Sequence, residues 1–265
     1  DGENSKISNS YLLRNLSYAN SKESYGGGAY MIQGTGYNLV VANNRCYNGT
    51  CRGGGIFLES AKFYNNTIAY NMATNGTGIY HWQDDKTGVE SQLSLYNCII
   101  YDNYDNSNNR SVTDQVNSAA PGKMNPSHNC YMNSSDLSSK FLESDGNFTG
   151  TKAQAFPFED KTYENGHKGN FRFRNARLKN NFRLNEADGL AGNKCLNGGT
   201  TNVGNGIILP ETDMDYTNRI KDCAIDIGAY EADNTTNIAP HEKTNSAGIV
   251  DYIYYVPQFG IRNSA

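Results

Sequence analysis

A glycine-rich motif that recurs three times constrains the fold of this chain more than any other feature. It reads Gly-Gly-Gly-Ala-Tyr, Gly-Gly-Gly-Ile-Phe and Gly-Thr-Gly-Ile-Tyr, and its final glycines are Gly28, Gly55 and Gly78. These glycines lie 27 and 23 residues apart. A period of this length, without the 3.6-residue apolar spacing of a helix, accommodates a few short strands and their corners. One period therefore predicts one coil of a solenoid.

Four short apolar segments between or beside the glycine motifs end in asparagine, at Asn15, Asn43, Asn65 and Asn97. Coils of a solenoid stack about 4.8 Å apart, so each corner repeats directly above the last. Glycine supplies positive φ at such corners, and asparagine tolerates the left-handed region while its amide bonds to the equivalent amide of the next coil. We therefore predict an all-β fold, a right-handed parallel β-helix (solenoid). The residues that this fold gives a structural role are Gly28, Gly55, Gly78, Asn65 and Asn97.

The repeat loosens after about Asn103, and the region that follows is expected to be irregular. Residues 104–126 are polar and rich in asparagine and serine, which indicates a long loop, and residues 141–183 carry less regular strands. Near the end the composition changes to a polar linker followed by a strand-like run. We predict a parallel β-helix domain over residues 1–232 and a linker with a strand-like tail over residues 233–265.

Charge and hydropathy exclude two classes of function. The net charge is -4 and the pI is about 5.6, whereas a nucleic-acid-binding domain normally has a basic face and a pI above about 9. No stretch approaches the roughly 18 consecutive apolar residues of a membrane-spanning helix, and the mean hydropathy is -0.69. We therefore expect no nucleic-acid partner and no transmembrane segment in the chain.

Six cysteines leave two redox states open. An even number suits three disulfides in an oxidising compartment, and free buried thiols are the alternative. Cys195 and Cys223 flank one C-terminal loop, which makes them the preferred candidates for a bridge. The six are Cys46, Cys51, Cys98, Cys130, Cys195 and Cys223.

Three C-terminal segments resemble the signature of a known family. They read Leu-Pro-Glu-Thr-Asp-Met-Asp at 209–215, Arg-Ile at 219–220 and Asp-Ile-Gly-Ala-Tyr-Glu at 226–231. This pattern resembles bacterial right-handed parallel β-helix proteins of the choice-of-anchor Q type, which are related in pattern to polymorphic outer-membrane, adhesin-like proteins. The resemblance covers most of residues 13–232. It implies a secreted or outer-surface bacterial location, and structural roles for Asp226, Gly228 and Tyr230.

Proteins of that type usually carry further N-terminal coils and a cap. An uncapped coil exposes a sheet edge that is ready to pair with another chain. We therefore expect that N-terminal coils preceding Asp1, or another chain, cover the open end.

Acidic residues beside aromatic ones make the first candidate for catalysis. Asp84 and Asp85 follow the third glycine motif, next to His81 and Trp82. Two carboxylates could act as acid and base on a polysaccharide or bind calcium, and the aromatic rings could stack on a sugar. The competing interpretation is a solvated surface loop, because adjacent acids on an extended strand point to opposite sides. Whether the chain is an enzyme stays open, with the balance against it.

A second acidic pair could hold calcium. Asp213 and Asp215 alternate along an extended stretch, which places both carboxylates on one side. The alternative is that Arg219 pins this loop through the same carboxylates. No other cofactor is predicted.

The preferred functional hypothesis is a surface module without catalysis, adhesin-like or glycan-binding. Tyrosine offers apolar contact and a hydroxyl, and asparagine offers a paired donor and acceptor, so both suit sugar hydroxyls. The candidate ligand-binding residues are Tyr80, Trp82, Tyr101 and Tyr104. The expected partners are a polysaccharide, a cell-surface glycan, or a surface protein of a host or neighbouring cell. The alternative is a polysaccharide lyase or glycoside hydrolase that acts on a uronic-acid polymer.

Overall fold

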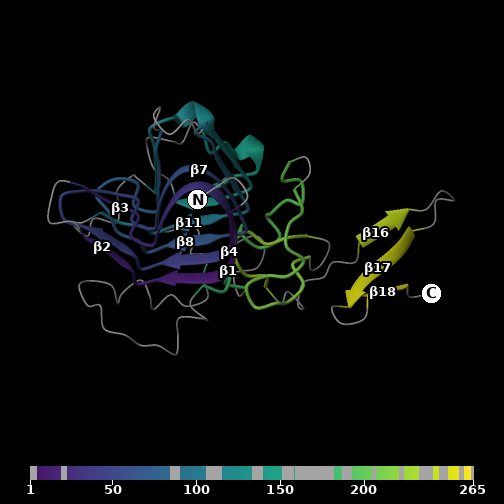
Figure 1. Ribbon diagram of the computed structural model, residues 1–265. Coiled ribbons are helices and arrows are strands. Elements are labelled where there is room, and N and C mark those ends of the chain that lie inside the picture. Colours follow the sequence, from purple (N-terminus) through teal and green to yellow (C-terminus); the bar gives the residue numbers. More distant parts are fainter. Residues whose placement is uncertain are drawn as a thin grey trace.

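The computed structural model describes residues 5–18, 23–83, 90–105, 115–132, 140–150, 158, 182–186, 193–204, 207–220, 224–232, 241–244, 250–256 and 260–263. The chain is all-β and forms a parallel β-solenoid of about four turns (Figure 1). This confirms the predicted fold class. Among the described residues, no helix has the length and apolar character needed to cross a membrane.

The solenoid is built on one main sheet of eleven strands, which stack in parallel from coil to coil. Two short 3-10 helices, η1 (Pro121–Lys123) and η2 (Glu143–Asp145), lie between its later strands. The strands are β1 (Lys6–Leu13), β4 (Ala29–Ala42), β7 (Ile56–Tyr64), β8 (Thr67–Ala69), β9 (Ile79–His81), β10 (Leu93–Tyr96), β11 (Ile99–Tyr101), β12 (Val116–Ser118), β13 (Met124–Ser127), β14 (Cys130–Met132) and β15 (Phe148–Gly150).

Equivalent strands of successive coils pair in register. Ala29 of β4 pairs with Ile56 of β7, and Ile56 pairs with Ile79 of β9, so the three glycine motifs stack directly on one another. Ile79 then pairs with Val116 of β12, which is much further along the chain. The number of residues in a coil therefore varies, while the stacking of its strands does not.

The extra residues of the early coils form a lateral flap. Strands β2 (Leu16–Tyr18) and β5 (Arg45–Tyr47) pair in parallel, and so do β3 (Glu23–Tyr25) and β6 (Thr50–Arg52). Between these two small sheets, Cys46, Cys51 and Ala73 form a separate apolar cluster. The flap thus has its own core beside the solenoid.

The first corner of each coil carries a ladder of asparagines, which are buried except for the exposed Asn15 of the first coil. The residue before each ladder position has positive φ, at Arg14, Asn43, Tyr70 and Asp102. The ladder itself consists of Asn15, Asn44, Asn71, Asn103 and, in the last coil, Gln115.

Asn71 shows how the ladder joins three coils. Its Oδ1 accepts the backbone N–H of Asn44 at 3.0 Å and the Nδ2 of the same residue at 2.9 Å. Its Nδ2 donates to the carbonyl oxygen of Val41 at 2.8 Å and to Oδ1 of Asn103 at 2.9 Å. Each asparagine therefore satisfies buried backbone groups of the corner, which would otherwise lack partners.

The second corner repeats this design with different residues. Asn65, Asn97 and His128 adopt φ values of 55°, 54° and 52° at this corner. The ladder amides belong to Asn66, which follows Asn65, and to Asn129, which follows His128, whereas Cys98 follows Asn97 and donates its N–H to Asn129. The sequence pattern had aligned Asn43 with Asn65 as one corner. That alignment is wrong, because the two residues lie at different corners, and in both cases the ladder amide belongs to the next residue.

The final glycines of the repeated motif lie against the ladder. A Cβ on Gly55 would lie 2.6 Å from the carbonyl oxygen of Gly78 and 3.0 Å from Nδ2 of Asn71. Gly28 and Gly78 have the same environment, with the equivalent ladder amides. Close approach of neighbouring coils to the ladder therefore requires glycine here.

The strands after the second corner have two apolar faces. Val41 and Ile100 point into the interior of the solenoid, whereas their neighbours Val40 and Ile99 point outward. Alternate residues of a strand face opposite sides. We call the outward-facing residues Val40, Ala69, Ile99, Tyr101 and Cys130 the outward row. This row would be exposed unless another segment covered it.

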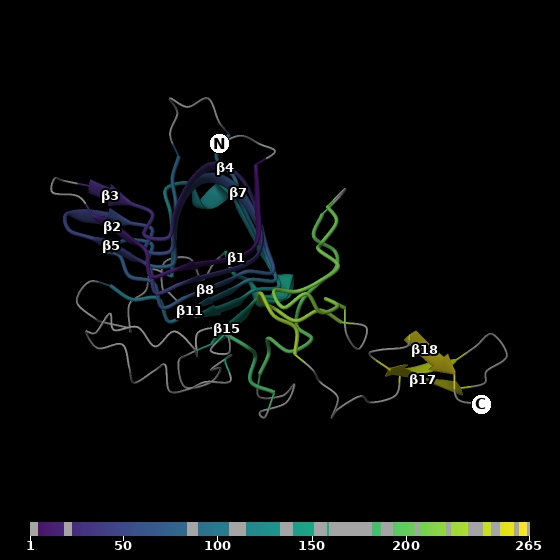
Figure 2. The ribbon, with the colours of Figure 1, turned by 60° about the horizontal axis from the view of Figure 1, so that its bottom comes forward.

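The C-terminal cover, defined as residues 193–204, 207–220 and 224–232, lies over this outward row (Figure 2). Its Leu196 and Ile227 belong to the same buried cluster as the outward row. The cover supplies few regular strands of its own and is held by side-chain and backbone contacts to the second corner.

Three further strands follow the cover. β16 (His241–Thr244), β17 (Val250–Val256) and β18 (Gly260–Asn263) form an antiparallel sheet. β17 lies within the predicted strand-like run (residues 249–259), whereas β16 lies within the segment predicted to be a linker (residues 233–247). Most of the predicted linker lies outside the described residues.

Candidate functional site

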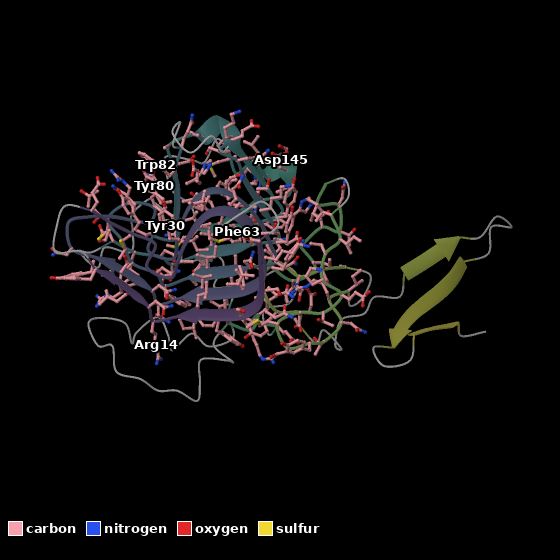
Figure 3. All side chains as sticks on the ribbon, viewed as in Figure 1. Arg14, Tyr30, Phe63, Tyr80, Trp82 and Asp145 are labelled. Atoms are coloured by element: carbon pink, nitrogen blue, oxygen red, sulfur yellow. The ribbon has the colours of Figure 1, made fainter. Side chains whose placement is uncertain are left out.

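Three aromatic rings stack on the side of the solenoid that follows the glycine motifs. Tyr30, Phe57 and Tyr80 each lie two residues after the last glycine of a motif, and the parallel register places them one above another. Ring centroids lie 5.0 Å apart between Tyr30 and Phe57, and 5.5 Å apart between Phe57 and Tyr80. We call these three residues the aromatic column; Tyr30, Tyr80 and the adjacent Trp82 are labelled in Figure 3.

Two more aromatic residues and one arginine flank the column. Tyr25 lies 4.7 Å from Phe57, and Trp82 lies 6.3 Å from Tyr80, measured between ring centroids. The guanidinium carbon of Arg52 lies 5.6 Å from the ring centroids of Tyr80 and Trp82 and 5.9 Å from that of Tyr25. At this distance the cation is attracted to each ring, which orders the side chains before any ligand binds.

A carboxylate completes the surface. Glu23 accepts a hydrogen bond from the Tyr25 hydroxyl and lies 3.2 Å from a guanidinium nitrogen of Arg52. The hydrogen bond from Tyr25 and the charge of Arg52 lower the pKa of the Glu23 carboxyl, while the bond to Glu23 raises the pKa of the Tyr25 phenol. Glu23 is therefore ionised at neutral pH, beside a cation and a phenol.

The surface formed by the aromatic column, Tyr25, Trp82, Arg52 and Glu23 combines apolar and polar groups. Tyr30 is 55% exposed, and Tyr25 and Trp82 are half-buried, whereas Phe57 is packed beneath them. Exposed ring faces beside a charged donor and a charged acceptor suit a ligand that has both apolar and hydroxyl-bearing sides. This is the candidate functional site, which we call the aromatic site.

The sequence predictions for ligand binding divide between two places. Tyr80 and Trp82 lie together in the aromatic site, where Trp82 is half-buried; Tyr80 is only 8% exposed, and its ring stacks on Phe57 and Trp82, so it supports the site and offers little free ring face. Tyr101 and Tyr104 lie in the body of the solenoid, where they are 1% and 7% exposed, so neither presents a ring face to a ligand. Sequence reasoning missed Tyr30, whose position two residues after a repeated glycine is the signal that could have found it.

The catalytic candidates cannot be brought together from the described residues. Asp84 and Asp85 lie outside them. His81 is fully buried, with Nδ1 at 2.8 Å from the Ser118 hydroxyl and Nε2 at 2.7 Å from the Ser91 hydroxyl. A histidine with both nitrogens bonded inside the protein positions β9 against its neighbours rather than facing a substrate.

The environment of His81 predicts a pH-dependent stability. Burial lowers its pKa to about 4, from about 6.5 in the unfolded chain. The folded state therefore favours neutral imidazole, so stability is complete above pH 6.5 and falls as the pH drops toward 4, by about 3 kcal/mol in total. Urea unfolding of the protein and of His81→Gln between pH 7 and 4 checks this. The stability advantage of the wild type should shrink on acidification, and an advantage independent of pH would contradict the assignment.

The acids suggested as calcium ligands have other partners. Asp213 is buried, and its Oδ1 accepts the backbone N–H of Asp215 at 2.9 Å while its Oδ2 accepts that of Glu231 at 3.0 Å. Asp215 forms an ion pair with Arg183. Calcium would have to compete with these donors, and no cluster of three potential metal ligands occurs among the described residues.

The C-terminal signature forms a buried charge network. Arg219 is 1% exposed and donates to Oε1 of Glu231 at 2.6 Å and to Oδ1 of Asn38 at 2.6 Å. Burial raises the pKa of the Glu231 carboxyl, and the charge of Arg219 opposes that shift. Asp226 accepts the backbone N–H groups of Asn197 and Ala232, both at 2.6 Å.

Two other residues of the signature anchor the cover to the solenoid. The backbone N–H of Gly228 donates to the carbonyl oxygen of Asn97 at 2.9 Å, and its φ of 115° suits glycine. The hydroxyl of Tyr230 hydrogen-bonds with that of Tyr11 on β1. The signature thus holds the cover in place and lies apart from the residues of the aromatic site.

Comparisons of the chain with protein families, with curated proteins and with solved structures found no match. The fold therefore rests on the structure itself, and the choice-of-anchor Q resemblance stays a prediction.

Proposed function

We propose that this chain is a glycan-binding β-solenoid module of a secreted or cell-surface protein, and that the aromatic site holds the sugar. The observation that carries the proposal is the grouping of the exposed ring of Tyr30 and the half-buried rings of Tyr25 and Trp82 around the pair of Arg52 and Glu23. Sugars have apolar C–H faces and hydroxyl edges, which match aromatic faces and charged hydrogen-bonding groups respectively.

The rigidity of the site supports this function. Each ring of the aromatic column is fixed by a strand of the solenoid and by the ring stacked on it, with interplanar angles of 12° and 5°. Arg52 is held by three rings and by Glu23. A ligand therefore meets a preorganised surface and orders few side chains on binding, which limits the entropic cost of association.

Binding to a glycan array, run beside a screen for polysaccharide depolymerisation, tests the proposal. We expect binding without cleavage. For the glycan that binds best, Trp82→Ala and Tyr30→Ala should each weaken the affinity about fivefold, because each removes one aromatic contact worth roughly 1 kcal/mol. Calorimetric titration measures both values.

Tyr18→Ala is the matched control. Tyr18 is also exposed and also stacks on another tyrosine, Tyr47, with a centroid distance of 6.2 Å, but both lie on the β2–β5 sheet of the flap, whereas Tyr25 and Arg52 of the aromatic site lie on its β3–β6 sheet. Its removal should leave the affinity unchanged. Binding to no glycan, or equal losses in all three variants, would reject the aromatic site, and release of oligosaccharides would instead support a lyase or hydrolase.

A further inference from the structure

Two cysteines that are distant in the sequence meet beneath the C-terminal cover. Cys130 lies on β14, between Ile99 of β11 and Phe148 of β15, and belongs to the outward row of the sheet. Cys195 lies at the start of the cover, and its carbonyl oxygen accepts the N–H of Ile227 at 2.8 Å. Both side chains are buried, at 3% and 0% exposure.

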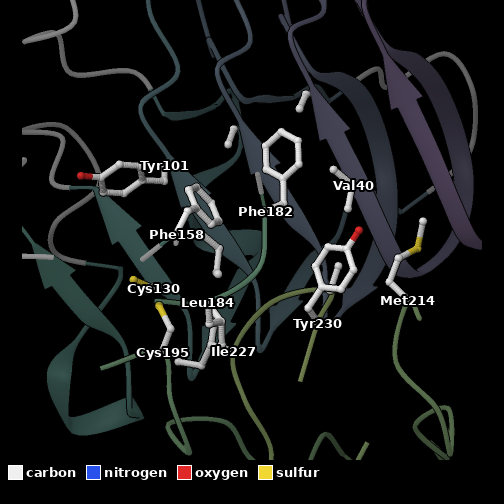
Figure 4. Close-up of a cluster of buried hydrophobic side chains, with 14 of the residues drawn as sticks. Val40, Tyr101, Cys130, Phe158, Phe182, Leu184, Cys195, Met214, Ile227 and Tyr230 are labelled. Atoms are coloured by element: carbon white, nitrogen blue, oxygen red, sulfur yellow. The ribbon is translucent and has the colours of Figure 1, made fainter. Parts of the chain in front are cut away.

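The two sulfur atoms face each other. Figure 4 shows them on neighbouring side chains, with Leu184 and Ile227 close by. The Cys130 thiol is close enough to raise the pKa of the Cys195 thiol. Both are free thiols in the structure, and Cys223, the partner expected for Cys195 from the sequence, lies outside the described residues.

We propose that Cys130 and Cys195 form a disulfide when the chain folds in an oxidising compartment, and that this bond fastens the C-terminal cover to the solenoid. The two thiols lose two protons and two electrons as the S–S bond forms. The oxidant is a disulfide, either oxidised glutathione or a disulfide oxidoreductase, which is reduced to two thiols by exchange.

The bond has to form before the cover closes. In the folded protein both sulfurs are inaccessible, and burial together with the Cys130 thiol raises the pKa of Cys195 far above its usual range. The thiolate that attacks a disulfide is therefore scarce once the cover is in place. Refolding with oxidised glutathione should give the bridge, whereas addition of the same oxidant to the folded, reduced protein should give it far more slowly.

Peptide mapping without reduction identifies the bond. Lys123, Lys140, Lys194 and Lys221 place Cys130, Cys195 and Cys223 on three different tryptic peptides. The full chain is refolded with reduced and oxidised glutathione, alkylated in denaturant and digested. We expect the peptide of Cys130 to be linked to that of Cys195. A link between Cys195 and Cys223, or alkylation of both Cys130 and Cys195, would overturn the proposal.

A thermal measurement provides a second readout. The bond closes a loop of about 65 residues, and the chain-entropy relation then predicts that reduction lowers the melting temperature by about 10 °C. In the double variant Cys130→Ala with Cys195→Ala, the reductant should have a correspondingly smaller effect. Equal effects of the reductant on wild type and double variant would contradict the bridge.

Discussion

Replacement of Arg219 by methionine should lower the free energy of unfolding by about 4 kcal/mol, because the substitution leaves buried acceptors without their donor. Glu231 would lose its partner at 2.6 Å, and Oδ1 of Asn38 would lose another at 2.6 Å. The carbonyl oxygen of Gly228, which also accepts from Arg219, would be unpaired as well, whereas that of Ala229 would keep the N–H of Met214 at 2.9 Å. Urea denaturation measures the loss.

Two further variants separate lost charge pairing from lost packing. The double variant Arg219→Met with Glu231→Gln removes the stranded carboxylate and should recover part of the stability. Lys123→Met breaks the exposed ion pair with Glu90, at 2.9 Å, and should cost less than about 1 kcal/mol.

The Arg219→Met deficit should also shrink as the pH falls. Burial already raises the pKa of Glu231, and removal of the opposing cation raises it further, so protonation relieves the unpaired charge. A deficit below 1 kcal/mol, or one that grows on acidification, would contradict the network as described.

Asn71→Ala should have a comparable effect, a loss of about 4 kcal/mol, for a different reason. The truncation leaves two donors of Asn44, the carbonyl oxygen of Val41 and part of Asn103 without partners in a buried corner. Each buried unsatisfied group costs about 1–3 kcal/mol, and the groups left without partners lie in the coils on both sides of Asn71. Chemical denaturation followed by circular dichroism measures the change.

Asn125→Ala is the control for the ladder. Asn125 also donates an amide hydrogen bond, to the Tyr96 hydroxyl at 2.7 Å, but it is exposed on the surface. Its replacement should cost less than about 0.5 kcal/mol. If the two alanine variants were equally stable, the ladder would not be a source of stability.

The fold could be predicted from the sequence because its main determinants repeat. The glycine motifs and the asparagines recur once in each coil. Few other residues tolerate the positive φ that the stacked corners require. The repeat did not, however, show that each coil has two asparagine corners. Asn43 and Asn65 look alike in sequence, and only the pairing of Val40 with Thr67 shows that they belong to different corners.

The site was predictable in part, for a related reason. Trp82 and Tyr80 were found by their proximity in sequence, whereas the aromatic column depends on parallel register between coils. The contacts of the C-terminal cover could not be predicted from the sequence, because Asn38 contacts Arg219, and Cys130 lies beside Cys195, across long stretches of irregular chain. No local pattern encodes such pairs.

Because the strands stack in register whatever the number of residues in a coil, the loops of this fold can change in length during evolution without disturbing the sheet. Ile79 pairs with Ile56 on one side and with Val116 on the other, although the connecting segments differ greatly in length. Insertions at the lateral flap or after Asn103 therefore leave every ladder amide and every paired strand where it was. A lineage that carries this frame can gain, lose or exchange surface loops without refolding its scaffold, and an engineer can graft a binding loop at the same places.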